Sequence, residues 1–328
     1  MIGSFRNNIP YNFFLLIIYA VLLKWSTFIH PVPPVSSASD PFLYQFLIGR
    51  HMTFFSHYPI VASIISFGLI VYQAVALNHL AYEQKLYAKP NYLSAMALVL
   101  FSSLFSTWHA LSGTLIASTF MVWVLGRLCK MGHLPEAGKS LFNIGLISGI
   151  AALFYFSSIV FLLLVMLSLV ISRAFKLSEW VLVFLGFITP YYLVLSLLYL
   201  NNYDLRQVLP DTGLSLPVVH LSQYEWSSII LVLVTSAVGF VLIQNNMRRL
   251  LVQSRKSWSI TFIFLLIAVL IAFANKAPSF TNYYFIIPPM ALVAAAAYHY
   301  PSRRWFPNLS HWGLVILSII VGYFFITH

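Results

Sequence analysis

The sequence predicts an all-α fold, a polytopic transmembrane helical bundle that lies almost wholly within or against a lipid bilayer. Of its 328 residues, 60% are hydrophobic and only 8% are charged, and the mean hydropathy is +0.87. A soluble globular chain carries roughly 25% charged residues, so this chain has too little charge to cover a water-facing surface. Apolar runs of about 20 residues, each enough to cross a bilayer core of about 30 Å, recur along the whole length. We therefore expect a single integral membrane domain over residues 1–328.

Eleven apolar segments are predicted to be transmembrane helices. The first exceeds the roughly 7–15 apolar residues of a signal peptide, so it is interpreted as a retained helix. Residues 92–129 and 141–173 are each too long for one ordinary helix and barely long enough for two, so each is predicted to form a helical hairpin. Nine spans is the alternative. The predicted spans are residues 11–29, 59–79, 92–108, 112–129, 141–156, 158–173, 179–200, 226–245, 258–274, 282–299 and 311–327.

The basic residues predict an orientation. With eleven spans, fourteen Lys and Arg residues fall on the side of the N-terminus, and only Arg50, Arg206 and Lys276 fall on the other side. Lys and Arg gather on the cytoplasmic side of a membrane. We therefore expect a bacterial inner-membrane protein with a cytoplasmic N-terminus and a periplasmic C-terminus. The net charge of +11 is divided among short clusters, which indicates membrane lipids as partners and excludes nucleic acid.

Two predicted outer loops, residues 30–58 and 201–225, are long enough to carry a site. The first contains an apolar stretch, residues 41–48, that is too short to span and is predicted to be an interfacial helix. Asp40 directly precedes this stretch. Its carboxylate could act as a base toward an acceptor hydroxyl. Alternatively, it could cap the helix, with Pro41 at the first helical position, and the two roles are compatible.

Several other residues are candidates for binding a lipid phosphate or a substrate. Arg50 and His51 lie on the outer side, where positive charge is rare, and arginine suits bidentate binding of an anion. Contact with lipid headgroups is the alternative. His109 is placed at the outer tip of the first predicted hairpin. A histidine there could carry a proton or bind phosphate, or it could simply occupy a turn at the headgroup level.

The second outer loop and the start of the tenth span supply further binding candidates. Arg206 lies between Asp204 and Asp211, so it could pair locally or neutralise a phosphate. Lys276 is followed by Tyr283 at the start of the tenth span, an arrangement that suits a lipid phosphate. Snorkelling of the lysine toward the interface is the alternative explanation.

Three features inside the spans complete the candidates. Lys24 lies within the first span, where an ionisable residue is by default a functional hypothesis, but it is near the outer end and is expected to snorkel. Gly145 and Gly149 have a spacing that permits close helix packing. Cys129 is the single cysteine, which excludes an internal disulfide framework and a Cys-rich metal site. The sequence identifies no cofactor-binding residues, and it leaves open whether the protein uses a cofactor or a metal.

Two segments carry a family resemblance. Residues 1–5 with Pro10 and Asn12, and the middle section around Phe142, Asn143 and residues 149–158, resemble an uncharacterised Bacteroidetes family of integral membrane proteins, a domain of unknown function. The resemblance covers the whole chain. It implies a membrane location and no established activity.

A weaker similarity is to the GT-C superfamily of polyprenyl-phosphate-sugar glycosyltransferases. Those enzymes have an outer loop after the first span with a catalytic Asp and an interfacial helix, and Asp40 before residues 41–48 matches this feature. The short paired spans around residues 149–158 also look similar. The chain departs from the family in lacking a paired acidic motif and a sizeable outer soluble domain. Acceptor recognition would then fall to the loops or to a partner.

The leading hypothesis is a GT-C-like transferase, or a degenerate relative, that acts on a lipid-linked glycan at the outer leaflet with a polyprenyl-phosphate-linked donor. Asp40 would be the base, and Arg50, Arg206 or Lys276 would neutralise donor phosphates. A non-enzymatic membrane subunit of an envelope secretion, motility or assembly complex is the first alternative, favoured by the scarcity of intramembrane charge. A lipid or small-solute transporter is the second. It would need discontinuous helices and midplane ionisable residues, for which the sequence offers little beyond Lys24.

Overall fold

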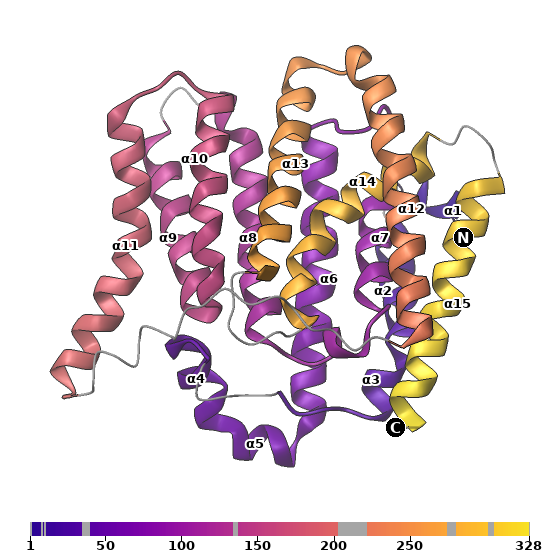
Figure 1. Ribbon diagram of the computed structural model, residues 1–328, viewed down its shortest axis with the longest axis horizontal. Helices are drawn as coiled ribbons and strands as arrows, with labels where there is room; N and C mark the ends of the chain where they lie inside the picture. The colour runs from indigo at the N-terminus through magenta and orange to yellow at the C-terminus, as the bar shows by residue number, and fades with distance from the viewer. Residues whose placement is uncertain are drawn as a thin grey trace.

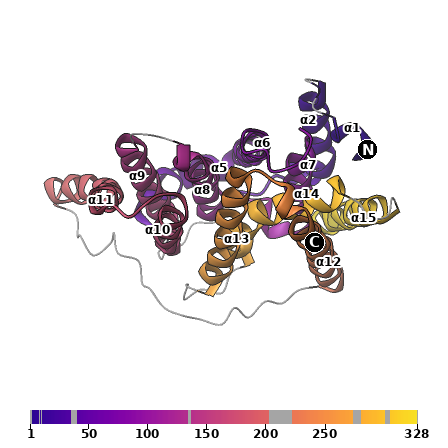
Figure 2. The ribbon, with the colours of Figure 1, turned by 90° about the horizontal axis from the view of Figure 1, so that it is seen from above.

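The computed structural model describes residues 2–7, 9, 11–34, 40–133, 137–202, 222–273, 280–300 and 305–327, and all regular elements in these ranges are helices. Most of the long helices run roughly side by side (Figure 1). Seen from above, they form a flattened, elongated array with α11 (Leu177–Leu200) at one extreme and α2 (Tyr11–Leu23) and α15 (Trp305–Thr327) toward the other (Figure 2). The all-helical fold class predicted from composition is confirmed for these residues.

The remaining helices differ widely in length. Short 3₁₀ segments join several of them. Three are used below, η1 (Gly49–His51), η2 (Ser106–Trp108) and η7 (Phe280–Ile286), and η4 (Phe156–Val160) lies between α9 and α10. The other α-helices are α1 (Ile2–Phe5), α3 (Trp25–Ile29), α4 (Phe42–Leu47), α5 (Met52–His57), α6 (Pro59–Glu83), α7 (Leu93–Ser102), α8 (Gly113–Lys130), α9 (Gly138–Phe154), α10 (Phe161–Ser172), α12 (Gln223–Asn246), α13 (Val252–Phe273) and α14 (Ile287–His299).

Each of the eleven predicted spans contains helix, but only some of these helices can cross a membrane alone. Within the described residues, six helical stretches are long and apolar enough to do so, and they make the chain a multi-pass membrane protein by length and composition. The other predicted spans correspond to α2, α7, α8, α9 and α10, of which α7 has only 10 residues. The count of eleven therefore stays a prediction. The six stretches are Pro59–Glu83, Leu177–Leu200, Gln223–Arg249, Val252–Phe273, Phe280–His299 and Trp305–Phe324.

The helix breaks fall where the two hairpin turns were predicted. The first break separates α7 from α8, and the Ser112 hydroxyl at its end accepts a 3.3 Å hydrogen bond from the Leu115 amide, which caps α8. The second break separates α9 from α10. The two breaks touch, because a Cβ added to Gly113 would lie 2.5 Å from the Phe154 carbonyl oxygen. Glycine is therefore required where α8 begins against the end of α9.

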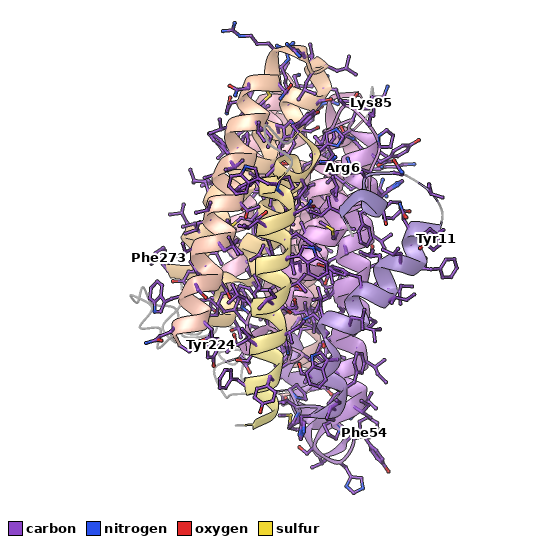
Figure 3. All side chains as sticks on the ribbon, turned by 90° about the vertical axis from the view of Figure 1, so that its right-hand side faces the viewer. Arg6, Tyr11, Phe54, Lys85, Tyr224 and Phe273 are labelled. Atoms are coloured by element: carbon purple, nitrogen blue, oxygen red, sulfur yellow. The ribbon has the colours of Figure 1, made fainter. Side chains whose placement is uncertain are left out.

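The two ends of the bundle differ in their content of basic residues. The α10–α11 and α12–α13 connections lie at the top of Figure 1, and α4 and α5 lie at the bottom. Lys85 and Arg6 lie toward one end of the molecule, and Phe54 lies at the other (Figure 3). We call these the basic end and the α4–α5 end. Besides Arg6 and Lys85, the helix termini and connections of the basic end carry Lys89, Arg127, Lys130, Lys139, Arg173, Lys176, Arg248, Arg249, Arg255 and Lys256.

Close packing of α9 on α11 follows from the predicted glycine spacing. A Cβ added to Gly145 would lie 2.2 Å from the Val183 carbonyl oxygen, and one added to Gly149 would lie 2.4 Å from that of Phe187. Gly186 on α11 meets α9 in the same way. The structure therefore supports the predicted role of Gly145 and Gly149, because only residues without a side chain allow the two backbones to approach this closely.

Helix α7 occupies the centre of the fold. All ten of its residues are buried, and it packs against α2, α6, α14 and α15. Since α7 ends at Ser102 in the interior of the bundle, its last carbonyl groups need partners there rather than in water. The chemistry of those partners defines one of the two candidate sites described below.

Candidate functional site

The first candidate site is the interfacial platform, which we define as Asp40, α4, η1 and α5. Both helices lie at the lower edge of the bundle (Figure 1). They expose large apolar side chains, including Phe46, Leu47, Phe54 and Tyr58. Short helices that combine such side chains with basic residues suit the boundary between lipid headgroups and acyl chains. The segment that was predicted to be a short interfacial helix is thus helical over Phe42–Leu47.

Tyr44 fastens the platform to the bundle. Its side chain is buried, and its hydroxyl donates a 3.2 Å hydrogen bond to the Leu111 carbonyl. Burial, aided by the negative charge of Asp40, raises the pKa of Tyr44 well above its ordinary value. The phenol therefore remains a hydrogen-bond donor at physiological pH. Through this contact, α4 lies directly on the break between α7 and α8.

Asp40 lies at the entrance to α4 and is partly exposed. The helix begins at Phe42, and Pro41 holds the cap position. The two roles considered for Asp40, as a base and as a cap, both stay predictions. The Asp40 backbone carbonyl accepts a 2.8 Å hydrogen bond from the Gln45 side-chain amide. Its carboxylate lies near enough to Tyr44 to affect the phenol.

The structure describes only some of the cationic residues that were predicted to act with Asp40. Arg50 and His51 are exposed on η1, and the Arg50 guanidinium lies 5.8 Å from the Phe46 ring centroid. Arg50 forms no ion pair with the acidic residues that the structure describes. Arg206 and Lys276 lie outside the described residues. Arg50 and His51 therefore lie on the platform, and the positions of Arg206 and Lys276 stay predictions.

Tyr283 belongs to an aromatic cluster that joins η2 to η7. Its ring centroid lies 5.3 Å from that of Phe280, which in turn stacks on Trp108 at 5.1 Å. The Trp108 indole also donates a 3.1 Å hydrogen bond to the Phe280 carbonyl. Tyr283 is half-buried at the edge of this cluster. Its hydroxyl is therefore less constrained than those of the fully buried tyrosines.

The second candidate site is the buried polar cluster around Lys24. The expectation that Lys24 snorkels is wrong, because its side chain is only 1% exposed. The break between α2 and α3 turns it inward, and its Nζ donates a 2.9 Å hydrogen bond to the Ser102 carbonyl. Ser102 is the last residue of α7, so the amine lies at the negative end of that helix dipole. A lysine at this position stabilises a helix end that is cut off from water.

His109 lies in the same cluster rather than at an exposed turn. It is 3% exposed, its ring interacts with the charge of Lys24, and its carbonyl accepts a 3.1 Å hydrogen bond from Ser66. Nearby, the Ser103 and Ser318 hydroxyls lie 2.8 Å apart. The structure therefore brings together Lys24 and His109, which are 85 positions apart in sequence. Sequence reasoning missed the serines, whose signal is a pair of adjacent small polar residues at the end of an apolar run.

The two sites share a short length of chain. His109 lies in the buried polar cluster, and Leu111, two residues later, accepts the hydrogen bond of Tyr44. Tyr44 of the platform therefore contacts the chain two residues after His109.

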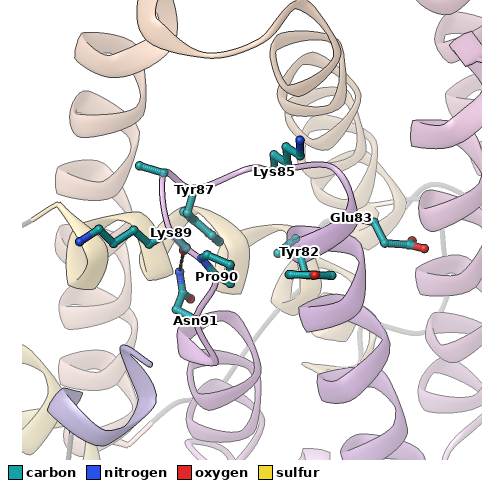
Figure 4. A pocket seen from close by; sticks show the side chains of 9 residues that line it. Tyr82, Glu83, Lys85, Tyr87, Lys89, Pro90 and Asn91 are labelled. Atoms are coloured by element: carbon teal, nitrogen blue, oxygen red, sulfur yellow. Dashed lines mark hydrogen bonds between the residues drawn. The ribbon is translucent and has the colours of Figure 1, made fainter. Parts of the chain in front are cut away.

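A shallow pocket of about 390 Å³ lies at the basic end, around the loop between α6 and α7. Lys85 adopts a left-handed backbone conformation there, with φ of 48°. The loop is held by hydrogen bonds from the Ser254 hydroxyl to the carbonyls of Gln84 and Lys85. Figure 4 shows that Lys85 and Lys89 point to different sides of the loop. They do not converge on a common ligand, so this pocket is not a candidate site.

The residues that the structure describes contain no group of three or more His, Cys, Asp or Glu side chains that could hold a metal ion. Cys129 is buried and unpaired.

Comparison with known proteins gives one match. Residues 35–328 match the model of a family of unknown function, DUF6427. No curated protein and no solved structure matches the chain. The expected relation to a domain of unknown function is thus supported, whereas the GT-C similarity gains no support from these comparisons. Because the matched region covers most of the sequence, the chain belongs to the DUF6427 family.

Proposed function

We propose that this chain is a membrane-embedded transferase that acts on a lipid-linked glycan at the α4–α5 end, with Asp40 as the general base. The observation that carries the proposal is the position of Asp40 on the interfacial platform. It is a partly exposed carboxylate directly before α4, beside two short helices with exposed apolar side chains. A lipid-linked substrate would present its phosphate and sugar at this level.

The proposed reaction uses few groups of the protein. The Asp40 carboxylate takes the proton of an acceptor hydroxyl while the hydroxyl oxygen bonds to the anomeric carbon of the donor sugar. The bond from that carbon to the phosphate oxygen breaks, and its electron pair leaves with the lipid phosphate. Arg50 lies on the same platform, where its charge would stabilise the leaving phosphate. Arg206 and Lys276 are proposed to add positive charge.

The proposed side of the membrane follows from charge. Apart from Arg50 on the platform and the buried Lys24, the described Lys and Arg residues gather at the end opposite the platform, and basic segments favour the cytoplasmic side. We therefore place the platform at the outer leaflet of a bacterial inner membrane, with the N-terminus inside and the C-terminus outside.

The test is a comparison of glycans in cells that lack the gene and carry one of three plasmids. These would encode the natural protein, Asp40→Asn, or Glu83→Gln, the same carboxylate-to-amide change at the end of α6 away from the platform. We expect the natural protein and Glu83→Gln to restore the lipid-linked and surface glycan profile and Asp40→Asn to fail at equal membrane abundance. Restoration by Asp40→Asn would refute the proposal. If the same cells yielded a stable complex with other membrane proteins, that result would favour the non-enzymatic subunit.

Transport of a lipid or small solute is a second candidate that a specific observation favours. The helices are interrupted at Lys24, between α7 and α8, and between α9 and α10, and Lys24 is an ionisable residue in the bundle interior. Interrupted helices around such residues occur in transporters. Substrate flux into liposomes that contain the purified protein would support this candidate, and flux equal to that of empty liposomes would count against it.

A further inference from the structure

Lys24 has no acidic counter-charge among the described residues. Four acidic residues lie in the described part of the chain, and none pairs with Lys24. Glu83 contacts His79 and Lys130, and Glu179 contacts Arg173. Glu225 contacts Ser222 in a capping box, and Asp40 lies at the platform near Tyr44. The amine of Lys24 therefore lies in the bundle interior with none of the described carboxylates beside it.

Hydrogen bonding leaves the protonated amine incompletely satisfied. An ammonium group has three N–H donors, and the side chain of Lys24 donates one described hydrogen bond, to the Ser102 carbonyl. The hydroxyl of Ser26, which is fully buried on the next turn, has no hydrogen-bond partner among the described residues. A charged group that is buried and only partly satisfied is costly. The neutral amine needs fewer acceptors, so loss of a proton relieves this cost.

We propose that Lys24 and His109 form a proton-binding site inside the bundle, in which the pair holds one exchangeable proton at the end of α7. The two side chains contact neighbouring backbone groups at the end of α7, Lys24 at the Ser102 carbonyl and His109 at Ser103, and both are almost completely buried. Two positive charges this close repel each other, so uptake of a proton by one side chain opposes uptake by the other. The proton passes between the Lys24 amine, the His109 imidazole and water. The site is independent of the proposed transferase chemistry.

Other titratable groups lie on the helices packed around the pair. Tyr19 is on α2, one turn before Lys24, and His311 is on α15, which packs against α3 and α7. Their rings stack at 5.9 Å. The Tyr19 hydroxyl and both His311 ring nitrogens are buried and have no hydrogen-bond partner within the described structure. Tyr298 of α14 lies beside them, and α6 faces the pair with the uncharged Ser66.

These unpartnered atoms suggest how a proton reaches the pair. Buried polar groups that lack a protein partner commonly bind ordered water. Water at Tyr19 and His311 would extend the buried polar cluster toward the basic end, where Arg6 donates a 2.9 Å hydrogen bond to the Tyr298 carbonyl. The charge of Arg6 disfavours a second positive charge in this region. The proton therefore exchanges between the pair and the basic end by way of Tyr19 on α2, His311 on α15 and the water beside them.

The test observes the lysine amines directly in the full-length protein. The chain has eight lysines, and ¹³C at the ε-carbon of each reports by NMR whether its amine is charged. Labelled protein in lipid nanodiscs would be titrated between pH 5 and 9. We expect one signal to move across this range, to vanish in Lys24→Met and to persist in Lys89→Met, a matched change at the basic end. If no signal moves, or if the moving signal persists in Lys24→Met, the proposal is wrong.

His109→Asn tests the pairing. Because coupled groups change each other's titration, we expect the pH midpoint of the Lys24 signal to shift by about one pH unit. An unchanged midpoint would refute the pair. If Lys24→Met does not fold, the spectrum of the natural protein still decides, since eight stationary signals would show that no lysine exchanges a proton in this range and would refute the proposal. The glycan profile of Asp40→Asn has no bearing on these signals, so the two proposals can fail separately.

Discussion

The crossing of α9 and α11 allows the most quantitative prediction. A Cβ added to Gly145 would lie 2.2 Å from the Val183 carbonyl oxygen, whereas ordinary contacts begin at 3.4 Å. The two backbones must therefore move apart by about 1.2 Å to accept Gly145→Ala. Overpacking of this kind costs about 1–3 kcal/mol. It is only partly offset by the gain of about 1 kcal/mol from replacing glycine with alanine in a helix.

The control for this prediction is Gly68→Ala in α6. Gly68 is exposed, and an added Cβ would meet no atom within 4 Å. We expect this variant to be as stable as the natural protein or slightly more stable. Both variants would be unfolded by sodium dodecyl sulfate in mixed micelles, with the helical circular dichroism signal as the readout. Equal unfolding midpoints for Gly145→Ala and Gly68→Ala would show that α9 and α11 do not make backbone contact at this crossing.

Three further changes test other parts of the structure. Tyr44→Phe removes the hydrogen bond to Leu111 and should weaken attachment of α4 by about 1 kcal/mol, measured as faster proteolysis within residues 40–58. Because burial raises the pKa of Tyr44, its hydrogen bond contributes fully to the attachment of α4 below the ordinary tyrosine pKa of about 10, and this contribution is lost at higher pH. A proteolysis rate of the natural protein that stays constant above pH 10 would contradict this. Glu179→Gln leaves the Arg173 guanidinium, which has a 14% exposed side chain, without its carboxylate. It should lower the free energy of unfolding by roughly 3 kcal/mol, whereas a loss below about 1 kcal/mol would show an unimportant pair. Glu225→Ala removes the capping box of α12 and should cost about 1 kcal/mol, visible as faster amide exchange at residues 223–226 and not at the start of α13.

The sequence was informative about helices because hydropathy and helix breakers are local signals. The breaks between α7 and α8 and between α9 and α10 lie at the predicted turns, where small and polar residues interrupt apolar runs. The glycine spacing at Gly145 and Gly149 also predicted close helix packing. Span count was harder to predict, because α7 has only 10 residues and local hydropathy does not show whether such a helix crosses the membrane with its neighbour.

The buried polar cluster could not be predicted, because it depends on tertiary contacts. Lys24 lies near the end of its span in sequence, so snorkelling was the reasonable expectation. The break between α2 and α3 instead turns its side chain toward Ser102 and His109, residues that are 78 and 85 positions away. The platform was more accessible to sequence reasoning, since Asp40 and the apolar stretch that follows it are adjacent in the chain.

The central claim is that the platform around Asp40 receives a lipid-linked substrate. The most direct measurement is a cryo-electron microscopy map of the full-length protein. The protein would be purified from its own membranes in nanodiscs that retain native lipid. We expect a lipid whose headgroup lies at Asp40 and Arg50 and whose tail extends along the exposed side chains of α4 and α5. A partner protein that covers the platform, with no lipid headgroup at Asp40, would contradict it.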